Sequence, residues 1–388
     1  MDFSPSEDQE AIRSAVRQLC AGFGDEYWRE IDRKGEYPER FVRALSEAGW
    51  LAALIPSAYG GGGLGVSEAA VIIEEINRSG ANAAAAHAQM YTMGTLLRHG
   101  SEEQKRRYLP PLAKGDLRLQ AFGVTEPEAG SETTRIKTTA VKRGDRYVIN
   151  GKKVFISRAQ HSDLMLLLAR TTPYDELDDK TRGLSVFLID LKRAVKDGRI
   201  RIRPIDTMLN HHTTELFIEE LEATAADLVG QEGMGFRQIL DSWNVERILI
   251  ASEAIGDGRW FVDRATRYAT ARVVFGKAIG ENQGVQFPIA AAYARIEAAS
   301  LVRDKAAWLF DRDKPCGAEA NMAKLLASQA SWDAANAAMD TYGGYGFAAE
   351  YDIERKFRET RLLVVAPISN NLVLAYLGHN VLGMPRSY

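Results

Sequence analysis

Glu246 is the residue whose type and position most clearly favour chemistry. It lies in the segment GFRQILDSWNVERILIASEAIG, and on a helix it shares one face with Ile239, Trp243 and Ile250. A carboxylate in such an apolar stripe is desolvated, which raises its affinity for protons toward that of a general base near neutral pH. Arg247 points about 100° around the helix axis and need not neutralise it. The pattern predicts a proton-abstracting group at position 246.

Two structural explanations of the same pattern stay open. Glu246 could be paired with a basic residue of another helix, or this face of the helix could be solvated. Neither explanation involves catalysis.

The glycine-rich tract YGGGGLG, residues 59 to 65, resembles a phosphate-binding loop in composition. It follows no apolar strand, however, and no lysine is placed to reach a phosphate. We therefore interpret it as a structural loop before a helix that starts near Ser67.

The composition sets the class of protein. A chain of 388 residues is long enough for two or three packed units. With 46% hydrophobic residues, 26% charged residues and a formal net charge of -3, it gives no electrostatic reason to expect a nucleic-acid partner. The start, MDFSPSEDQEAIRSAV, lacks the features of a signal peptide, and we identify no segment long and apolar enough to cross a bilayer. The sequence predicts a cytoplasmic protein without a membrane partner.

The two cysteines, Cys20 and Cys316, match no metal-ligand or redox spacing. So few thiols in a long chain suit a reducing compartment. We expect both to be buried small apolar side chains, and we predict no metal site.

The elements that must position Glu246 change type twice along the chain. Up to about residue 114 the signals are helical, with Ser4, Pro5 and Glu7 predicted as a helix start and Ser101 with Gln104 as a capping box. From about residue 233 to the end, long helical patterns return. Between them, short alternating or β-branched runs predict a β domain.

Within that β region, from about Leu117 to Ala223, the dipeptide Asn150-Gly151 separates two strand-like runs. Both residues tolerate the positive φ of a type I′ turn, so the sequence predicts a hairpin there. The order helical, β, helical argues against a Rossmann domain, which would alternate strands and helices. A nicotinamide enzyme is thus disfavoured.

The segment AFGVTEPEAGSETTRI, residues 121 to 136, resembles the TEP-x-AGSD signature of the acyl-CoA dehydrogenase family. Seven further segments are each similar to family landmarks in the same order: MDFSPSEDQ, YGGGGLG, NGKKVFIS, LVGQEGMGF, VERILIA, RVVFGKAIGENQ and YGGYGFAAEYDIERKFRETR. Together they cover the whole chain and are highly specific. The resemblance implies an α+β multidomain fold: an N-terminal α-helical domain (1–118), a middle β-barrel-like domain (119–223) and a C-terminal four-helix bundle (224–388).

The resemblance also implies FAD as the cofactor. The residues that would line the flavin and the thioester from the middle domain are Phe122, Val124, Thr125, Gly130 and Ser131. Phe155 and Ser157 stand where the family usually has tryptophan and threonine; phenylalanine keeps the apolar contact but loses the indole N–H. Thr125 and Ser131 could instead be turn-stabilising hydroxyls.

A second set of residues resembles those that reach FAD from a neighbouring subunit. In RVVFGKAIGENQ these are Arg272, toward the pyrophosphate, Phe275 and Gln283. By themselves, Arg272 could be a solvated helix charge and Phe275 a core aromatic. Further expected contacts are the paired glycines Gly343 and Gly344, Asp340 where glutamine is common, Ser369 and Asn371. A shared site of this kind implies a homo-oligomer, which we expect to be a tetramer.

The catalytic segment departs from most of the family. Most members carry their catalytic glutamate in an EGT motif after RDAR, but here RETRLLVVAPISNN puts Pro367 in that place. A minority branch, including isovaleryl-CoA dehydrogenase, uses a glutamate on the earlier helix directly before an arginine, which VERILIA matches with Glu246 and Arg247. The resemblance and the apolar stripe thus indicate the same base. Substrate contacts are expected from Ser131, Trp243, Asn244 and Arg247.

The implied reaction removes the α-proton of an acyl-CoA by Glu246 as hydride leaves the β-carbon for the flavin, giving a 2-enoyl-CoA. In the family, a flavin ribityl hydroxyl and the backbone N–H at the EGT glutamate position stabilise charge on the thioester oxygen. Proline has no N–H. If Pro367 occupies that position, loss of one donor predicts a rate penalty on the order of a hundredfold or more, unless an amide such as that of Ile368 substitutes.

The predicted function is therefore an acyl-CoA dehydrogenase that passes electrons to an electron-transfer flavoprotein. Pro367 and Asp340 slightly favour a flavin oxidase or monooxygenase on the same scaffold, and a catalytically impaired flavin- or CoA-binding homologue is a further alternative. His211 and His212 are expected to be exposed loop residues rather than contacts of the acyl chain.

Overall fold

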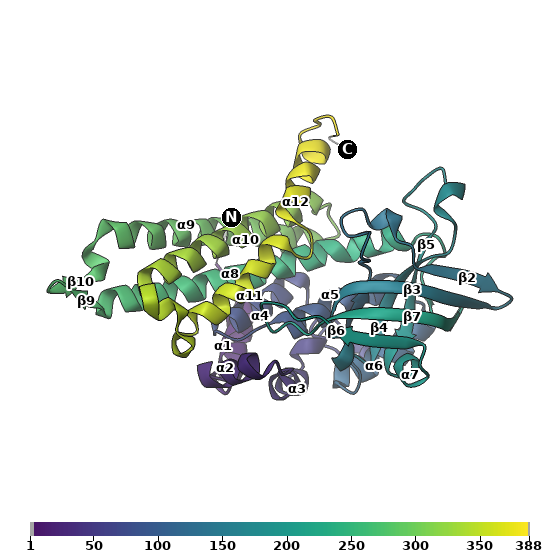
Figure 1. The fold of residues 1–388 in the computed structure, drawn as a ribbon, viewed down its shortest axis with the longest axis horizontal. Helices are drawn as coiled ribbons and strands as arrows, with labels where there is room; N and C mark the ends of the chain where they lie inside the picture. The colour runs from purple at the N-terminus through teal and green to yellow at the C-terminus, as the bar shows by residue number, and fades with distance from the viewer. Residues whose placement is uncertain (1–3, 387–388) are drawn as a thin grey trace. The chain divides into compact units, whose positions relative to one another are not determined.

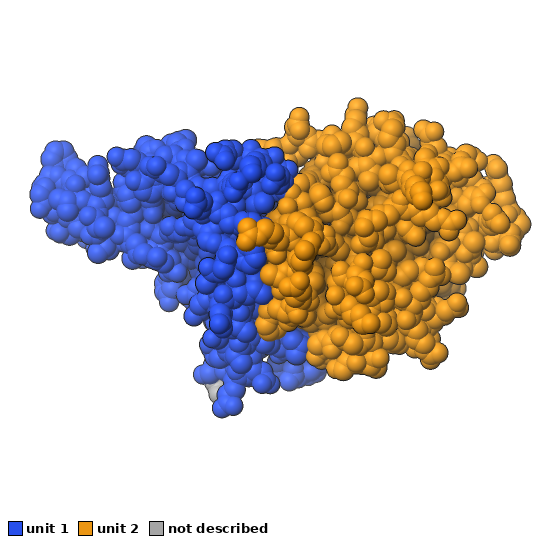
Figure 2. All heavy atoms as spheres, turned by 90° about the horizontal axis from the view of Figure 1, so that it is seen from below, with its two compact units in different colours: residues 1–36, 64–83, 244–388 blue, residues 37–63, 84–243 orange. Residues whose placement is uncertain are grey.

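A computed structural model describes residues 4–386 of the chain (Figure 1). The order along the chain is helical, then β, then helical, as the sequence predicts. By contacts between residues, the chain divides into two compact units (Figure 2). Unit 1 comprises residues 1–36, 64–83 and 244–388, and unit 2 comprises residues 37–63 and 84–243. Both units are therefore discontinuous in sequence.

Unit 2 is built on an eight-stranded sheet in which β1 pairs in parallel with β4 and the remaining order is β6-β7-β3-β2-β4-β5-β8. The strands are β1 (Leu119–Gly123), β2 (Thr139–Arg143), β3 (Arg146–Ser157), β4 (Leu164–Arg170), β5 (Leu184–Asp190), β6 (Ile200–Pro204), β7 (Thr213–Thr224) and β8 (Leu228–Val229). Every residue of β4 is buried, as expected for a strand covered on both faces.

The helices of unit 2 are α3 (Glu39–Glu47), α5 (Ala84–His99), α6 (Glu102–Lys114) and α7 (Leu191–Lys196), besides the start of α8. The predicted capping box at the start of α6 is confirmed. The Gln104 N–H donates to Ser101 Oγ at 3.1 Å, and the Ser101 N–H donates to Gln104 Oε1 at 3.0 Å.

The predicted hairpin at Asn150-Gly151 is wrong. Both residues lie inside the continuous strand β3, at a β-bulge opposite β7, and the turn between β2 and β3 instead contains Gly144. Gly151 is needed because a Cβ there would lie 2.3 Å from Thr138 Oγ1. The Asn150 side chain accepts from the Glu220 N–H at 2.8 Å, so it stabilises the bulge rather than a turn.

Unit 1 is helical. Its helices are α1 (Glu7–Ala21), α2 (Asp25–Lys34), α4 (Val66–Arg78), α8 (Gly235–Ala271, from Asn244 onward), α9 (Gln283–Phe310), α10 (Gly317–Tyr342), α11 (Ile353–Val365) and α12 (Asn370–Tyr376). The long helices α8, α9, α10 and α11 run side by side, and the short hairpin of β9 (Val273–Val274) and β10 (Lys277–Ala278) joins α8 to α9 at one end of this bundle (Figure 1).

The start of α1 differs from the prediction. The N-cap is Ser6 rather than Ser4, and the helix begins at Glu7. Ser6 is the N-cap because it forms a capping box with Gln9. The Ser6 N–H donates to Gln9 Oε1 and the Gln9 N–H donates to Ser6 Oγ, both at 3.2 Å.

The start of α4 is capped from far away in the sequence. The Asp311 carboxylate, just after α9, accepts from the Val66 N–H at 2.7 Å and from the Ser67 N–H at 2.9 Å. A negative charge is favourable at a helix N-terminus. The glycine-rich tract before α4 thus acts as a structural loop, as predicted.

A buried ion cluster ties α4 to α8 and α9. Glu74 of α4 is fully buried and accepts from Arg303 at 2.7 Å and from Arg13 at 3.1 Å, with a further ion pair to Arg259. Burial alone would raise the pKa of Glu74, but the positive charges of these arginines lower it to about 2. The cluster fixes the part of α8 that follows Glu246.

The segment Ile353–Val381 has the length and mean hydropathy, 1.4, of a membrane-spanning helix, which the sequence analysis did not anticipate. Only 11% of its most apolar window is buried. In the structure this segment is broken between α11 and α12, where the Ala366-Pro367 peptide is cis. The criterion is one of length and composition, and by itself it is weak evidence for a membrane span.

Candidate functional site

Glu246 lies on α8 in the apolar stripe that the sequence predicts. Its exposed fraction is 8%, and Ile239 and Ile250 are also buried. The burial excludes the explanation in which this face of the helix is solvated. Burial of a carboxylate restricts the access of water and favours its protonated form, which suits a general base.

Arg247 lies beside Glu246 and is half-buried. Its Nη1 donates to Asn244 Oδ1 at 3.3 Å, and among residues 4–386 its Nε has no hydrogen-bond partner. Burial lowers the pKa of Arg247, and the charge of Glu246 opposes that shift. The arginine therefore has donor capacity left for a substrate.

Lys324 of α10 is the neighbour that the sequence analysis missed. Its side chain is 0% exposed, and its pKa is lowered to about 7, first by burial and then by the charge of Arg247. The Lys324 ammonium group donates to Ile368 O at 2.6 Å, to Asn370 Oδ1 at 2.7 Å and to Val364 O at 3.3 Å. A lysine buried in an otherwise Ala-rich helix, MAKLLAS, is the sequence signal that could have identified it.

Lys324 thereby holds the connection between α11 and α12, which contains Pro367 and Ser369. Within the described part of the chain, the backbone N–H groups of Ile368 and Ser369 have no acceptor. Ser369 Oγ accepts from the Leu372 N–H at 3.4 Å as the N-cap of α12. Within unit 1, the charge of Glu246 interacts with that of Arg247, and the charge of Arg247 with that of Lys324, which holds this connection.

In unit 2, the TEP segment is fixed by a second buried ion pair. The Lys153 ammonium group donates to Glu126 Oε1 at 2.9 Å and to Val124 O at 3.0 Å. Glu126 also accepts from the Lys137 N–H at 2.5 Å and the Thr138 N–H at 2.9 Å. Burial lowers the pKa of Lys153 to about 8, against the opposing effect of Glu126. The sequence analysis assigned no role to Glu126 or Lys153, although a lysine in an apolar strand was visible.

The other predicted residues of this segment stay near the surface. Phe122 is half-buried, with its ring centroid 6.0 Å from that of Tyr91, and Ser131 is exposed. Among residues 4–386, the hydroxyls of Thr125 and Ser131 make no hydrogen bond, so neither stabilises a turn. Val124 and Thr125 are half-buried and Gly130 is exposed.

Phe155 is displayed by a distortion of β3. It has φ 57°, lies where the register with β7 shifts, and is 64% exposed. A left-handed phenylalanine is rare, and it persists here because the bulge turns the side chain away from the core. Ser157, two residues on, is half-buried.

The predicted contacts from a neighbouring subunit gather at one end of unit 1. Arg272 lies 5.9 Å from the centre of the ring of Tyr345, the residue that follows Gly343 and Gly344 in sequence. Arg272 forms no ion pair within the described residues. Phe275 is 100% exposed at the β9–β10 turn, which excludes a core role. Further exposed residues expected there are Gln283 and Asp340, and Asn371 is exposed on α12.

Comparison with known proteins identifies the family. Models of the N-terminal, middle and C-terminal domains of acyl-CoA dehydrogenase match residues 6–116, 121–221 and 233–366. The chain belongs to the acyl-CoA dehydrogenase family. The acyl-CoA dehydrogenase FadE12 of Mycobacterium tuberculosis is 33% identical over 100% of this chain and 99% of its own, and an acyl-CoA dehydrogenase of Bacillus subtilis is 34% identical over 97% and 99%.

Solved structures of the acyl-CoA dehydrogenase fold agree with this assignment. A glutaryl-coenzyme A dehydrogenase–glutaryl-CoA complex is 30% identical over 100% of this chain and 98% of its own, with a TM-score of 0.91. A prolyl acyl carrier protein oxidase, AnaB, is 28% identical over 98% and 100%, also with a TM-score of 0.91. The predicted fold class, with helical N- and C-terminal domains and a middle sheet domain, is confirmed, and the chain is an oxidoreductase whose family depends on FAD.

The two histidines after β6 differ from their predicted exposure. His211 and His212 are both half-buried. His212 Nδ1 lies 3.3 Å from His161 Nε2, and His211 Nε2 lies 3.4 Å from Arg158 Nη1. Burial lowers the pKa of His161 to about 4 and that of His211 well below its usual range. Hydrophobic pattern alone could not reveal this cluster, because its members come from separate loops.

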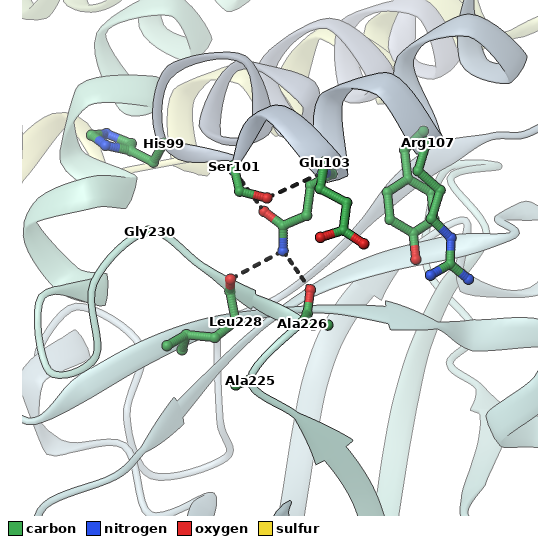
Figure 3. A pocket seen from close by; sticks show the side chains of 10 residues that line it. His99, Ser101, Glu103, Arg107, Ala225, Ala226, Leu228 and Gly230 are labelled. Atoms are coloured by element: carbon green, nitrogen blue, oxygen red, sulfur yellow. Dashed lines mark hydrogen bonds between the residues drawn. The ribbon is translucent and has the colours of Figure 1, made fainter. Parts of the chain in front are cut away.

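Unit 2 also has a surface pocket of about 330 Å³ between α6 and the segment around β8 (Figure 3). The Gln104 amide in this pocket donates to Ala226 O at 2.8 Å and to Leu228 O at 3.0 Å, so this side chain attaches α6 to the segment around β8. None of the predicted site residues lines it. We do not assign the chemistry to this pocket.

Proposed function

We propose that this enzyme converts an acyl-CoA thioester to its 2-enoyl-CoA and passes the electrons to an electron-transfer flavoprotein. The observation that carries the proposal is the burial of Glu246 on α8, beside the half-buried Arg247. Pro367 has no proton-accepting side chain, so it cannot be the base. Acyl-CoA dehydrogenation itself fits the family and its relatives.

Arg272 is exposed and forms no ion pair among the described residues, and the rings of Phe155 and Phe275 are exposed. A cation and aromatic faces of this kind suit a large anionic dinucleotide such as FAD. Bound FAD would supply the acceptor for the hydride equivalent removed from the β-carbon. The proposed cofactor contacts are Phe122, Val124, Thr125, Gly130, Ser131, Phe155, Ser157, Arg272, Phe275, Gln283, Asp340, Gly343, Gly344, Ser369 and Asn371.

Glu246 would take the α-proton onto a carboxylate oxygen, in surroundings from which water is largely excluded. Arg247 is the candidate donor to the thioester or its coenzyme A portion, since its Nε has no partner among residues 4–386. Asn244, which accepts from Arg247, would hold the guanidinium in place. Trp243 and Ser131 complete the proposed substrate contacts.

We propose a homotetramer in the cytoplasm, with the domain boundaries 1–118, 119–223 and 224–388. The fully exposed Phe275 and the 75% exposed Phe347 are large apolar side chains that an oligomer interface would cover. Two buried, unbridged cysteines are compatible with a reducing compartment.

The test is anaerobic mixing of the FAD-loaded enzyme with straight-chain, branched and cyclic acyl-CoAs, followed by flavin bleaching. Glu246→Gln should keep its FAD but lose several orders of magnitude in the bleaching rate, because the amide cannot accept the proton. Glu253→Gln is the matched control: it lies two helical turns along α8 and is equally buried. Normal bleaching in Glu246→Gln would contradict the assignment.

A second candidate, a flavin oxidase on the same fold, is favoured by Pro367 and by the likeness to a protein described as a prolyl acyl carrier protein oxidase. It predicts rapid reoxidation of the reduced enzyme by oxygen, with hydrogen peroxide formed in proportion to substrate. A reduced enzyme that reacts slowly with oxygen but quickly with an electron-transfer flavoprotein would support the dehydrogenase.

A further inference from the structure

We propose that the backbone N–H of Ser369, aimed by Lys324, is the donor that stabilises negative charge on the thioester oxygen in place of the amide that Pro367 lacks. This inference rests on the proposed function. It makes Lys324 a positioning residue, because its own ammonium group acts on the protein backbone and not on the substrate.

The geometry of the peptide unit carries the first step. Lys324 donates to Ile368 O at 2.6 Å, and that carbonyl belongs to the same peptide unit as the Ser369 N–H. In a planar trans peptide the C=O and N–H point in opposite directions. Fixing the carbonyl therefore fixes the N–H, which is directed away from Lys324 and has no acceptor among the described residues.

The second step separates Ser369 from the other available amide. The Ile368 N–H shares its peptide unit with the carbonyl of Pro367, and no hydrogen bond holds that carbonyl within residues 4–386. The Ser369 peptide is held at its oxygen, and Lys324 is itself held by Asn370 Oδ1 at 2.7 Å. Catalytic donors are effective when they are oriented before the charge develops, so Ser369 is the better candidate.

The third step is electrostatic. All three acceptors of Lys324 are neutral oxygens, from Val364, Ile368 and Asn370, so below its pKa of about 7 its positive charge is not neutralised by them. An ammonium group on a carbonyl polarises the peptide and strengthens its N–H as a donor. Lys324 is fully buried, and its charge interacts with that of Arg247, which indicates a local preference for an anion. A thioester oxygen that gains negative charge in the transition state meets that preference.

The decisive experiment compares Ser369→Pro with Ser369→Ala in the FAD-loaded enzyme. Both variants lose the hydroxyl, but only proline loses the N–H. The φ of Ser369 is -64° in this protein, close to the value of about -65° at which the proline ring fixes φ. With the best substrate of the acyl-CoA panel, we expect anaerobic flavin reduction about a hundredfold slower in Ser369→Pro than in Ser369→Ala.

A spectroscopic measurement separates this role from a structural one. The 2-enoyl-CoA product, labelled with ¹³C at the thioester carbonyl, should show a lowered carbonyl stretching frequency when bound to wild type and Ser369→Ala. The lowering should shrink in Ser369→Pro and in Lys324→Gln, which keeps donors but removes the charge, and Lys324→Arg should restore part of it. These shifts do not depend on turnover.

Equal reduction rates and equal carbonyl frequencies in the two Ser369 variants would overturn this inference and leave the proposed function intact. If no acyl-CoA reduces the flavin of the wild-type enzyme, the proposed function fails and this inference fails with it. A rate loss in Ser369→Pro without a change in carbonyl frequency would also overturn it, since the proline would then act through structure alone.

Discussion

Two lysines, one in each unit, are completely buried and hold a segment expected to contact the flavin, but their surroundings differ. Lys153 fixes the TEP segment and is paired with the Glu126 carboxylate at 2.9 Å. Lys324 fixes the connection around Ser369 through neutral oxygens, and the charge of Arg247 opposes its own. The pKa of each is lowered, to about 8 and about 7.

The comparison distinguishes Lys153, a cation with a structural role, from Lys324, a cation whose charge can act on other groups of the site. A buried ion pair is neutral as a whole, so Lys153 has little electric effect beyond Glu126. The charge of Lys324 is not cancelled by its hydrogen-bond acceptors and therefore extends to groups around the connection. We expect mutations at Lys153 to change stability most, and mutations at Lys324 to change the electrostatics of the site.

The largest expected effect on stability is that of Lys153→Met. Removing the ammonium group leaves the Glu126 carboxylate buried without a charged partner, which costs about 3–5 kcal/mol of unfolding free energy. The measurement is urea denaturation followed by circular dichroism at pH 7.

Lys152→Met is the control for that variant, because Lys152 is the next residue of β3 but is partly exposed and pairs with Glu215. The unfolding free energy lost in Lys152→Met should be much smaller than that lost in Lys153→Met. The double variant Lys153→Met, Glu126→Gln should recover stability relative to Lys153→Met alone, and no recovery would argue that packing, not charge, is the role of Lys153.

A smaller effect is expected from pH. In the folded state both lysines have a pKa below the unfolded value of 10.5, so the unfolded chain binds more protons and stability rises with pH. The rise begins near pH 7 for Lys324 and near pH 8 for Lys153, with a slope of at most about 1.4 kcal/mol per pH unit.

Between pH 7 and 8 the two lysines should therefore differ. The unfolding free energy of wild type relative to Lys324→Gln should rise by about 1 kcal/mol over this interval, and that relative to Lys153→Met by only about a third as much. The measurement is urea denaturation of the three proteins at pH 7.0, 7.5 and 8.0. Identical slopes for both variants would remove the distinction between the two sites.

The smallest effect is expected for Ser369→Ala. The hydroxyl caps α12 by accepting from the Leu372 N–H at 3.4 Å, and loss of such a cap costs about 0.5–1 kcal/mol. The thermal midpoint should fall by only a few degrees. A loss as large as that of Lys153→Met would show that the hydroxyl has another structural role.

The sequence was sufficient for the order of elements and for the stripe that contains Glu246, because both depend on periodicity along one helix or strand. The Asn150-Gly151 hairpin failed because its dipeptide suits a bulge as well as a turn. The bulge is favoured over the turn because Thr138 packs against Gly151, and this tertiary contact is not encoded in any local pattern.

The sites that sequence reasoning missed share one cause. Lys324, Lys153 and His211 are charged or titratable residues whose partners lie on other elements, so these partners could not be identified from the neighbouring sequence. The family resemblance identified the segments expected around the cofactor, but it did not identify the lysines that fix those segments.

The long-range cap of α4 has a consequence for the synthesis of the chain. Val66 and Ser67 obtain their acceptor only when Asp311 has been made, about 245 residues later. At ribosomal rates of roughly 5–20 residues per second, the N-terminal helices of unit 1 wait on the order of ten seconds or more for their partners. All segments of unit 2 emerge earlier, so we expect the sheet to fold first and the nascent first helices to depend on chaperones until translation ends.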